Sequence, residues 1–279
     1  MSSTQQPPNP ASPPSSSSYA AAVRPPNTMA VIRTDTAGLV AEDVKITTAT
    51  GVLPAYRAAP DRPGPHPVVL VVQEIFGLHE YIRDVARRLA KLGYLAIAPD
   101  LYFRQGDATV YTDIDALRAE IVNKVPDEQV MADLDACYAW SREAGGDPAR
   151  LGITGFCWGG RITWLYAAHQ PRLKAAVAWY GKLTGPKNAL QPRHPLDVSG
   201  QLKTPVLGLY GGEDPGIPMP QVEELRSDLK KVNSASQVLV YPGAPHAFHA
   251  DYRPSYRPEA AEDGWQRMKA WFAQNGLRP

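Results

Sequence analysis

A cysteine set between glycines is the residue of this sequence that most clearly could do chemistry. Gly155-Phe156-Cys157-Trp158-Gly159 has the G-x-C-x-G pattern of a nucleophile held in a tight turn between a strand and a helix. Glycines are needed there because the strained turn leaves little room for side chains. The N-terminus of the following helix favours a thiolate, and the N–H of Trp158 would face an oxygen attached to Cys157. The pattern predicts that Cys157 is a nucleophile.

Such a nucleophile needs a histidine base and an acid that orients it, in the chain order nucleophile, acid, histidine. Asp214 lies in a Gly- and Pro-rich loop after a predicted strand, and its neighbour Glu213 is the alternative. His246 follows the last predicted strand, and His249 is its rival three residues later. The order predicts a triad of Cys157, Asp214 and His246.

A further ionisable group follows the first buried run of the sequence. Glu74 comes directly after that run and could exchange a proton with the thiol. Ile75 stands where this kind of site takes a second oxyanion N–H, beside that of Trp158. The other histidines lack such a placement and are expected to be surface or loop residues: His66, His79, His169 and His194.

Alternating strands and helices must position these groups. Apolar runs predict buried strands and amphipathic stretches predict helices. After a hairpin at 44–48 and 53–57, strands are expected at 67–73, 94–98, 150–154, 175–180, 205–210 and 237–241. Helices are expected at 79–92, 128–143, 160–170, 220–232 and 258–274. This alternation predicts an α/β fold with a mostly parallel central sheet and helices on both faces. Active groups should then lie beyond the C-terminal ends of the strands.

Composition limits the partners and the organisation of the chain. Lys and Arg number 29 against 28 Asp and Glu, without a concentrated basic run, which argues against a nucleic-acid partner. The first 28 residues hold seven Pro and seven Ser. We therefore expect residues 1–30 to be a disordered tail and residues 31–279 to form one domain.

The sequence also bears on location and cofactors. It contains neither a signal-peptide pattern nor an apolar stretch of membrane-spanning length. Two cysteines, Cys137 and Cys157, suit a reducing compartment, so a cytoplasmic location without membrane contact is expected. No ligand spacing for a metal and no phosphate loop is found, so neither a metal nor a cofactor is expected.

Together the motifs resemble the dienelactone hydrolase family, which has the α/β-hydrolase fold. The resemblance runs from about residue 38 to the C-terminus. It rests on five motifs in order, namely Gln73-Glu74-Ile75-Phe76-Gly77, Pro99-Asp100-Leu101-Tyr102-Phe103-Arg104-Gln105, Gly155-Phe156-Cys157-Trp158-Gly159-Gly160, Gly212-Glu213-Asp214 and His246-Ala247-Phe248. It implies hydrolysis of dienelactone (carboxymethylenebutenolide), an enol-lactone, to maleylacetate.

The resemblance also implies roles for residues of the site. Cys157 would be the nucleophile, His246 the base and Asp214 the group that orients it. Glu74 would hold the resting thiol in a protected form and take its proton when substrate binds. Ile75 and Trp158 would supply the two oxyanion N–H groups.

Substrate recognition is where the sequence departs from the family. Two arginines grip the substrate carboxylate in the best-known members, and Arg104 matches the first, with Tyr102 of the same motif beside it. The second position is Ala250 here, and Arg253 is near but does not match. Loss of one of the two arginines that bind the carboxylate could change which substrate the enzyme prefers.

The leading hypothesis is a cysteine-dependent hydrolase of a small lactone or activated ester, acting through an acyl-enzyme as a monomer or small homo-oligomer. One alternative is a broad carboxylesterase or thioesterase that needs no substrate carboxylate. From another class, the chain could be a non-catalytic binding module or a thiol redox sensor built on Cys157.

Overall fold

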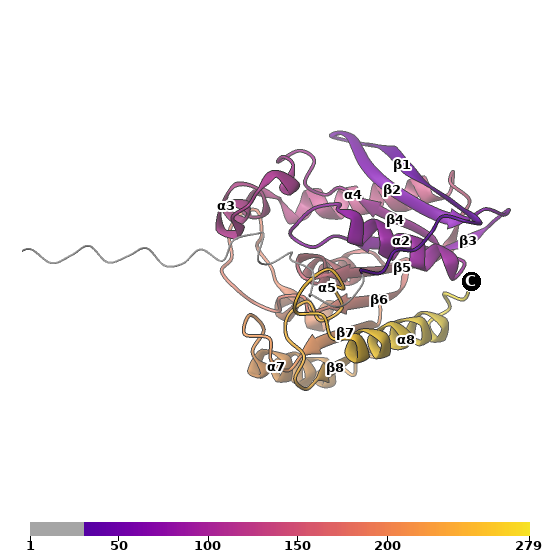
Figure 1. Ribbon diagram of the computed structural model, residues 1–279. Coiled ribbons are helices and arrows are strands. Elements are labelled where there is room, and N and C mark those ends of the chain that lie inside the picture. The colour runs from indigo at the N-terminus through magenta and orange to yellow at the C-terminus, as the bar shows by residue number, and fades with distance from the viewer. Residues whose placement is uncertain (1–30) are drawn as a thin grey trace, which may run out of the picture.

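One eight-stranded sheet forms the centre of the computed structural model, which describes residues 31–279 (Figure 1). Its order is β1-β2-β4-β3-β5-β6-β7-β8. Strands β1 and β2 form an antiparallel hairpin and β2 is antiparallel to β4, whereas every other pair is parallel. The strands are β1 (Leu39–Thr48), β2 (Gly51–Pro60), β3 (His66–Val72), β4 (Leu95–Pro99), β5 (Gly146–Phe156), β6 (Leu173–Trp179), β7 (Val206–Gly211) and β8 (Gln237–Tyr241). The predicted mostly parallel sheet is confirmed.

Helices cover both faces of the sheet. Neighbouring contacts join α4, α5, α6 and α7 into one layer, while α2 and α8 lie on the viewer's side of the sheet in Figure 1. The α-helices are α2 (Glu80–Lys91), α3 (Ile114–Glu120), α4 (Asp127–Ser141), α5 (Trp158–His169), α6 (Pro195–Val198), α7 (Met219–Lys231) and α8 (Pro258–Gln274). Short 3₁₀ turns are η1 (Ala108–Val110), η2 (Val122–Lys124) and η3 (Ser199–Gln201).

The position of β3 in the sheet explains where the site forms. All seven residues of this strand are buried, and its run from Val68 to Val72 is completely covered. In the sheet β3 has β4 on one side and β5 on the other. The chain passes from β3 to β4 and then crosses to β5 on the opposite side of β3. Where the connections of a parallel sheet diverge in this way, a crevice opens beyond the carboxyl ends of the strands. Glu74 and Cys157 follow β3 and β5 at that edge.

The long elements agree with the sequence prediction, and the short ones do not. Every predicted strand and helix has a counterpart, with β5 starting at Gly146 rather than at residue 150. Helices α3 and α6 and the 3₁₀ turns were not predicted, because pieces this short carry too few turns to show an apolar period. The predicted tail, residues 1–30, lies outside the described residues.

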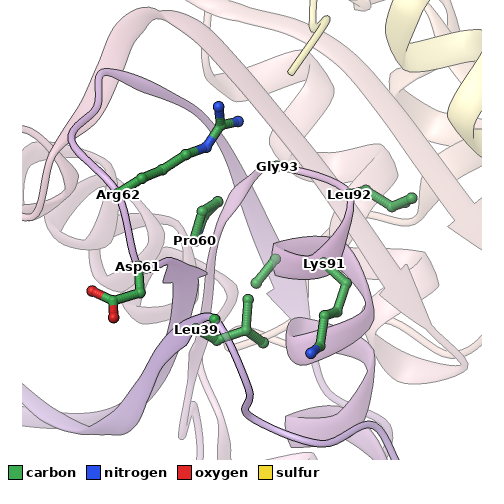
Figure 2. Close-up of a pocket in the computed structure, with 9 residues that line it drawn as sticks. Leu39, Pro60, Asp61, Arg62, Lys91, Leu92 and Gly93 are labelled. Atoms are coloured by element: carbon green, nitrogen blue, oxygen red, sulfur yellow. The ribbon is translucent and has the colours of Figure 1, made fainter.

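A hollow of about 330 Å³ lies on the opposite edge of the sheet (Figure 2). It is lined by the ends of β2 and α2, including Arg62, Lys91 and Gly93. Gly93 precedes β4, so this hollow faces the amino ends of the parallel strands and not the edge that carries Cys157.

Two further observations concern ligands and membranes. Within residues 31–279, no group of three or more His, Cys, Asp and Glu side chains is arranged to hold a metal ion. In the same part of the chain, no helix is both long and apolar enough to cross a membrane.

Candidate active site

Cys157 occupies a strained turn between β5 and α5. Its φ is +56°, a left-handed value that is uncommon for a residue with a side chain. The turn is fixed on both sides, because the N–H of Cys157 donates to the carbonyl of Trp179 at 3.0 Å and its own carbonyl accepts from Gly160 at 3.0 Å. Strain of this kind is kept at sites where it presents a functional group. The structure therefore places the thiol as the sequence pattern predicts.

Glycines around the turn are required by close backbone contacts. A Cβ atom at Gly155 would lie 2.2 Å from the carbonyl oxygen of Gly159. One at Gly159 would lie 2.5 Å from the carbonyl oxygens of both Val72 and Gln73. The first turn of α5 thus packs directly on the end of β3, which brings Trp158 and the residues after β3 to the same place.

Asp214 and His246 form a close pair beyond β7 and β8. The Nδ1 atom of His246 lies 2.6 Å from Oδ2 of Asp214. The other carboxylate oxygen accepts the N–H of Gly216 at 2.9 Å, which fixes the loop. Asp214 is buried, whereas Glu213 is exposed, and in the described part of the chain no hydrogen bond or ion pair joins Glu213 to the imidazole. The structure therefore pairs His246 with Asp214 and not with Glu213.

The charge of His246 is coupled to Cys157. Burial lowers the pKa of His246, but the charge of a Cys157 thiolate and hydrogen bonds with Asp214 and Cys157 raise it to about 10. The imidazole side chain remains 31% exposed, so it faces the opening of the site. A protonated His246 beside a thiolate is the pairing that activates a cysteine nucleophile.

His249, the rival base in the sequence, lies elsewhere. It is buried, and its Nδ1 atom lies 2.6 Å from the hydroxyl of Tyr81. Its ring packs on Trp179 and Trp265. Burial and the nearby charge of Arg88 hold the pKa of His249 well below its ordinary value. It is a neutral core histidine.

The two expected oxyanion residues lie at neighbouring chain segments. Trp158 is the first residue of α5, and Ile75 follows β3, on which that turn packs. In the described part of the chain, neither main-chain N–H donates to another backbone group outside the helices and strands. The two N–H groups are therefore free of such backbone bonds at the turn that carries Cys157.

Glu74 is completely buried and is held by donors other than the thiol. Its Oε2 atom accepts the hydroxyl of Tyr252 at 2.5 Å and lies 3.5 Å from Nε2 of His79. Its Oε1 atom lies 3.8 Å from Arg253. Burial raises the pKa of Glu74, but the nearby imidazole of His79 and the charge of Arg253 outweigh it, so the net pKa lies below the ordinary value. The Oε1 atom has no hydrogen-bond partner among the described residues. Among the described residues no hydrogen bond joins Glu74 to Cys157.

Arg104 is held in an ion pair with Asp133 of α4. Its guanidinium makes two contacts with the buried carboxylate of Asp133, at 2.7 and 3.0 Å. It also donates to the hydroxyls of Thr48 and Thr50 and stacks on Phe103. None of these partners belongs to the predicted triad, so Arg104 is not brought to the thiol in this structure.

Tyr102, from the same motif, does lie beside the nucleophile. It is fully buried, and its ring packs edge-on against Trp158 with centroids 5.0 Å apart. Burial and the charge of Cys157 raise the pKa of Tyr102 well above its ordinary value, so it stays a neutral phenol. Its hydroxyl is buried with no hydrogen-bond partner among the described residues.

Sequence reasoning missed Tyr180 and set Arg253 aside as a position that does not match the family's. Arg253 feels the charges of both Glu74 and Cys157, so an arginine reaches the site from a position that does not match the family's. Tyr180, after β6, has φ +39° and packs on His246. Tyr180 was expected to be the last residue of the strand at 175–180, and the structure ends that strand at Trp179.

The parallel sheet, the strained turn after β5 and the histidine after β8 define the class of this protein as an α/β hydrolase. The model of the dienelactone hydrolase family matches residues 53–276, and the chain belongs to that family. It is a hydrolase of the carboxymethylenebutenolidase-like kind.

Relatives and solved structures agree with this assignment. A Methylorubrum extorquens protein described as a "putative carboxymethylenebutenolidase" is 57% identical over 260 residues, covering 93% of this chain and 89% of that protein. An Escherichia coli protein of the same description is 57% identical, covering 88% and 91%. The crystal structure of a Klebsiella pneumoniae "putative dienelactone hydrolase" has a TM-score of 0.83 at 59% identity, covering 85% of this chain and 99% of that one.

Proposed function

We propose that Cys157, His246 and Asp214 form a catalytic triad that hydrolyses small lactones or activated esters through an acyl-enzyme. The observation that carries the proposal is the 2.6 Å pairing of His246 with Asp214, together with the coupling of His246 to the charge of Cys157. A cysteine in a strained turn with an oriented imidazole beside it is the arrangement of nucleophilic acyl transfer.

The reaction follows from these positions. The thiolate of Cys157 attacks the acyl carbon, and the N–H groups of Ile75 and Trp158 receive the negative charge that develops on the oxygen. The C–O bond then breaks, and protonated His246 gives its proton to the departing oxygen. In a lactone that oxygen remains attached to the acyl chain. Neutral His246 next takes a proton from water, whose hydroxide attacks the thioester and releases the carboxylic acid and the thiolate.

The substrate class is proposed from the relatives and from the lining of the site. The relatives' name, carboxymethylenebutenolidase, denotes an enzyme that opens an enol-lactone bearing a carboxylate. Tyr102 packs against Trp158 and has a buried hydroxyl without a hydrogen-bond partner among the described residues, and Arg253 places a positive charge near the thiol. Together these groups suit a small oxygen-rich acyl group.

A carboxylesterase with no carboxylate requirement is the second candidate. It is favoured by one observation, the engagement of Arg104 with Asp133, which keeps the family's first carboxylate-binding arginine away from the thiol. The rates on cis- and trans-dienelactone and on their neutral methyl esters separate the two functions. A marked preference for the carboxylates supports the lactonase, and equal rates support the esterase.

The nucleophile itself is tested by a pair of cysteine variants. Cys157→Ala should abolish turnover, whereas Cys137→Ala should retain it because Cys137 is buried on α4. Hydrolysis at the native rate in Cys157→Ala would refute the proposal. Burial also raises the pKa of Cys137, which makes it a poor resolving thiol for a redox sensor. The cytoplasmic location, the oligomeric state and the absence of a nucleic-acid partner stay predictions.

A further inference from the structure

The segment between β6 and α6 begins beside the proposed active site. Residues 181–194 contain no helix and no strand. Tyr180, directly before them, packs on His246 with ring centroids 5.2 Å apart. The first residue of the segment, Gly181, lies against the first turn of α5, because a Cβ atom there would be 2.3 Å from the main-chain carbonyl carbon of Gly160. The segment therefore starts next to the proposed base and to the first turn of α5.

Arg161 of α5 fastens the far end of this segment. Its side chain is only 5% exposed. Its Nη2 atom donates to the carbonyl of Arg193 at 2.6 Å, and its Nε atom donates to Nδ1 of His194 at 3.2 Å. Two more hydrogen bonds, each of 2.7 Å, reach the carboxylate of Asp127 in α4. One guanidinium thus joins two helices to the end of the segment.

Both ring nitrogens of His194 have a partner, and each has a fixed role. The Nε–H of an arginine can only donate, so Nδ1 of His194 accepts and carries no proton. The other nitrogen, Nε2, lies 3.1 Å from the carbonyl oxygen of Pro186, which can only accept, so Nε2 carries the hydrogen. A second proton would turn Nδ1 into a donor that faces another donor on a charged guanidinium. The network therefore requires a neutral His194.

We propose that Arg161 and neutral His194 are positioning residues that hold residues 181–194 beside the proposed active site, and that protonation of His194 releases this segment. The proton comes from solvent and binds Nδ1, which thereby loses the hydrogen bond from Arg161. Arg161 keeps its bonds with Asp127, so α4 and α5 stay joined while the segment loosens. The effect on catalysis rests on the proposed function, because it reaches the proposed base through Tyr180, whereas the release itself does not.

The surroundings of His194 favour its neutral form. Burial lowers its pKa below the ordinary value of 6.5, and the charges of Arg161 and Lys182 lower it further. The carbonyl of Pro186 and the carboxylate of Asp197 raise the pKa without reversing the shift. The titratable and charged groups around this ring are Arg161 of α5 with its partner Asp127 of α4, Lys182 of the segment, and Asp197 of α6 with its partner Lys187.

The sign of the pH dependence follows from the lowered pKa of His194. Because the held ring binds a proton less readily than a free one, the segment is held fully above pH 6.5. Between pH 6.5 and the lowered pKa of the held ring, each proton that binds favours the released segment. The hold is therefore lost on acidification and kept at alkaline pH.

The test is hydrogen exchange of main-chain amides in the full chain, followed from about pH 7.5 to about pH 5 across the ordinary histidine pKa. Rates are expressed as protection factors, which remove the intrinsic effect of pH. The amide of Leu196 reports the release, because it donates to the carbonyl of Leu183 in the segment at 3.1 Å. Its protection should fall by up to about tenfold for each pH unit below 6.5, since release binds one proton. Protection that is independent of pH in this range would overturn the proposal.

Two variants that cannot be protonated show whether His194 is the group that titrates. Asparagine places an oxygen near Nδ1 and can keep the bond from Arg161, whereas glutamine places an N–H near Nε2 and can keep the bond to Pro186. In His194→Asn and in His194→Gln the protection of Leu196 should no longer depend on pH, and either variant suffices if the other fails to fold. A loss of protection on acidification that persists in a folded variant would refute the role of His194.

His169→Asn is the matched control. His169 lies at the end of the same helix, α5, and its Nε2 atom pairs at 2.7 Å with Asp135 on the surface. This variant should keep the acid-induced loss of protection in full. If it abolished that loss as His194→Asn does, the release would not belong to His194 and the proposal would fail.

Nitrogen-15 NMR of the histidine rings gives a readout that a loss of packing alone would not move. The His194 signals, identified by their absence in His194→Asn, should show the form with hydrogen on Nε2 and a midpoint below 6.5. The form with hydrogen on Nδ1 would contradict the hydrogen bond from Arg161 and with it the proposal.

The pH profile of kcat/KM tests whether the hold serves the active site. The native protein should lose activity below pH 6.5 in parallel with the release, and His194→Asn should lack this part of the acid limb. The same acid limb in both proteins would refute the positioning role. If Cys157→Ala stayed active, the proposed nucleophile would fail, while hydrogen exchange would still decide whether His194 holds the segment.

Discussion

Replacing Asp214 by asparagine tests how far the carboxylate raises the pKa of His246. The change keeps the shape of the side chain but removes the charge that lies 2.6 Å from Nδ1. A hydrogen bond to a charged partner contributes about 1.5 to 3 kcal/mol. Because the His246 side chain is 31% exposed, solvent screening favours the lower end of that range. At 1.36 kcal/mol per unit, the pKa of His246 should fall from about 10 by about one unit.

The assay is the pH dependence of kcat/KM. Because protonated His246 must give its proton to the leaving oxygen, the rate should fall at alkaline pH as the imidazolium is lost. In Asp214→Asn this limb should move to lower pH by about one unit, and kcat/KM at its optimum should drop by about 100- to 10,000-fold as the imidazole loses its orientation. Glu213→Gln is the matched control, since Glu213 is exposed next to Asp214, and should change neither quantity.

Stability should show the same coupling. The pKa of His246 is raised from 6.5 to about 10 in the folded protein, so its protonation stabilises the fold fully below pH 6.5 and the benefit is lost as the pH rises to about 10. The difference in unfolding free energy between native protein and Asp214→Asn should therefore be greatest below pH 6.5. An alkaline limb that stays in place in Asp214→Asn, or moves equally in Glu213→Gln, would refute the reasoning.

Two further variants test the packing around the site. Gly159→Ala places a methyl group 2.5 Å from main-chain oxygens at the end of β3 and should cost about 1 to 3 kcal/mol in urea unfolding as well as most of the activity, whereas Gly200→Ala, whose nearest contact is 3.8 Å away, should cost less than about 1 kcal/mol. Equal losses would contradict the packing argument. Arg104→Ala leaves the buried carboxylate of Asp133 unpaired and should lower the unfolding free energy by about 3 kcal/mol. It should also slow hydrolysis of carboxylate and neutral substrates alike, and a loss confined to carboxylates would show that Arg104 binds them.

Much of the fold could be predicted because its signals are local. The continuous β-branched run of β3 and the amphipathic repeat of α2 each fix an element without reference to the rest of the chain. The turn at Cys157 could be predicted for the same reason, since the glycines that it needs lie within two residues of it. Helix α3 is too short to show a period, so it could not be.

The choice between neighbouring residues depends on tertiary packing. Glu213 and Asp214 differ in sequence by one position, yet only Asp214 turns inwards to His246, because the loop is closed by its bond to Gly216. The choice between His246 and His249 also depends on packing. The hydroxyl of Tyr81, on a helix distant in the sequence, forms a hydrogen bond with the ring of His249.

The surroundings of Glu74 were beyond the reach of the sequence. His79 was expected to be a surface or loop residue, and Tyr252 was not singled out. His79 lies in the same loop as Glu74, whereas Tyr252 reaches the carboxylate from the segment after His246, which is anchored by the ion pair of Asp251 with Arg88. A contact that joins residues 178 positions apart leaves no local pattern.

Intact-protein mass spectrometry during turnover tests the central claim most directly. Acid quenching of the enzyme with a slow activated ester should trap a species heavier by the mass of the acyl group, and peptide mapping should place that group on Cys157. Hydroxylamine should remove it, as expected of a thioester. Sustained turnover with no acyl group on Cys157, or an acyl group on another residue, would contradict the account.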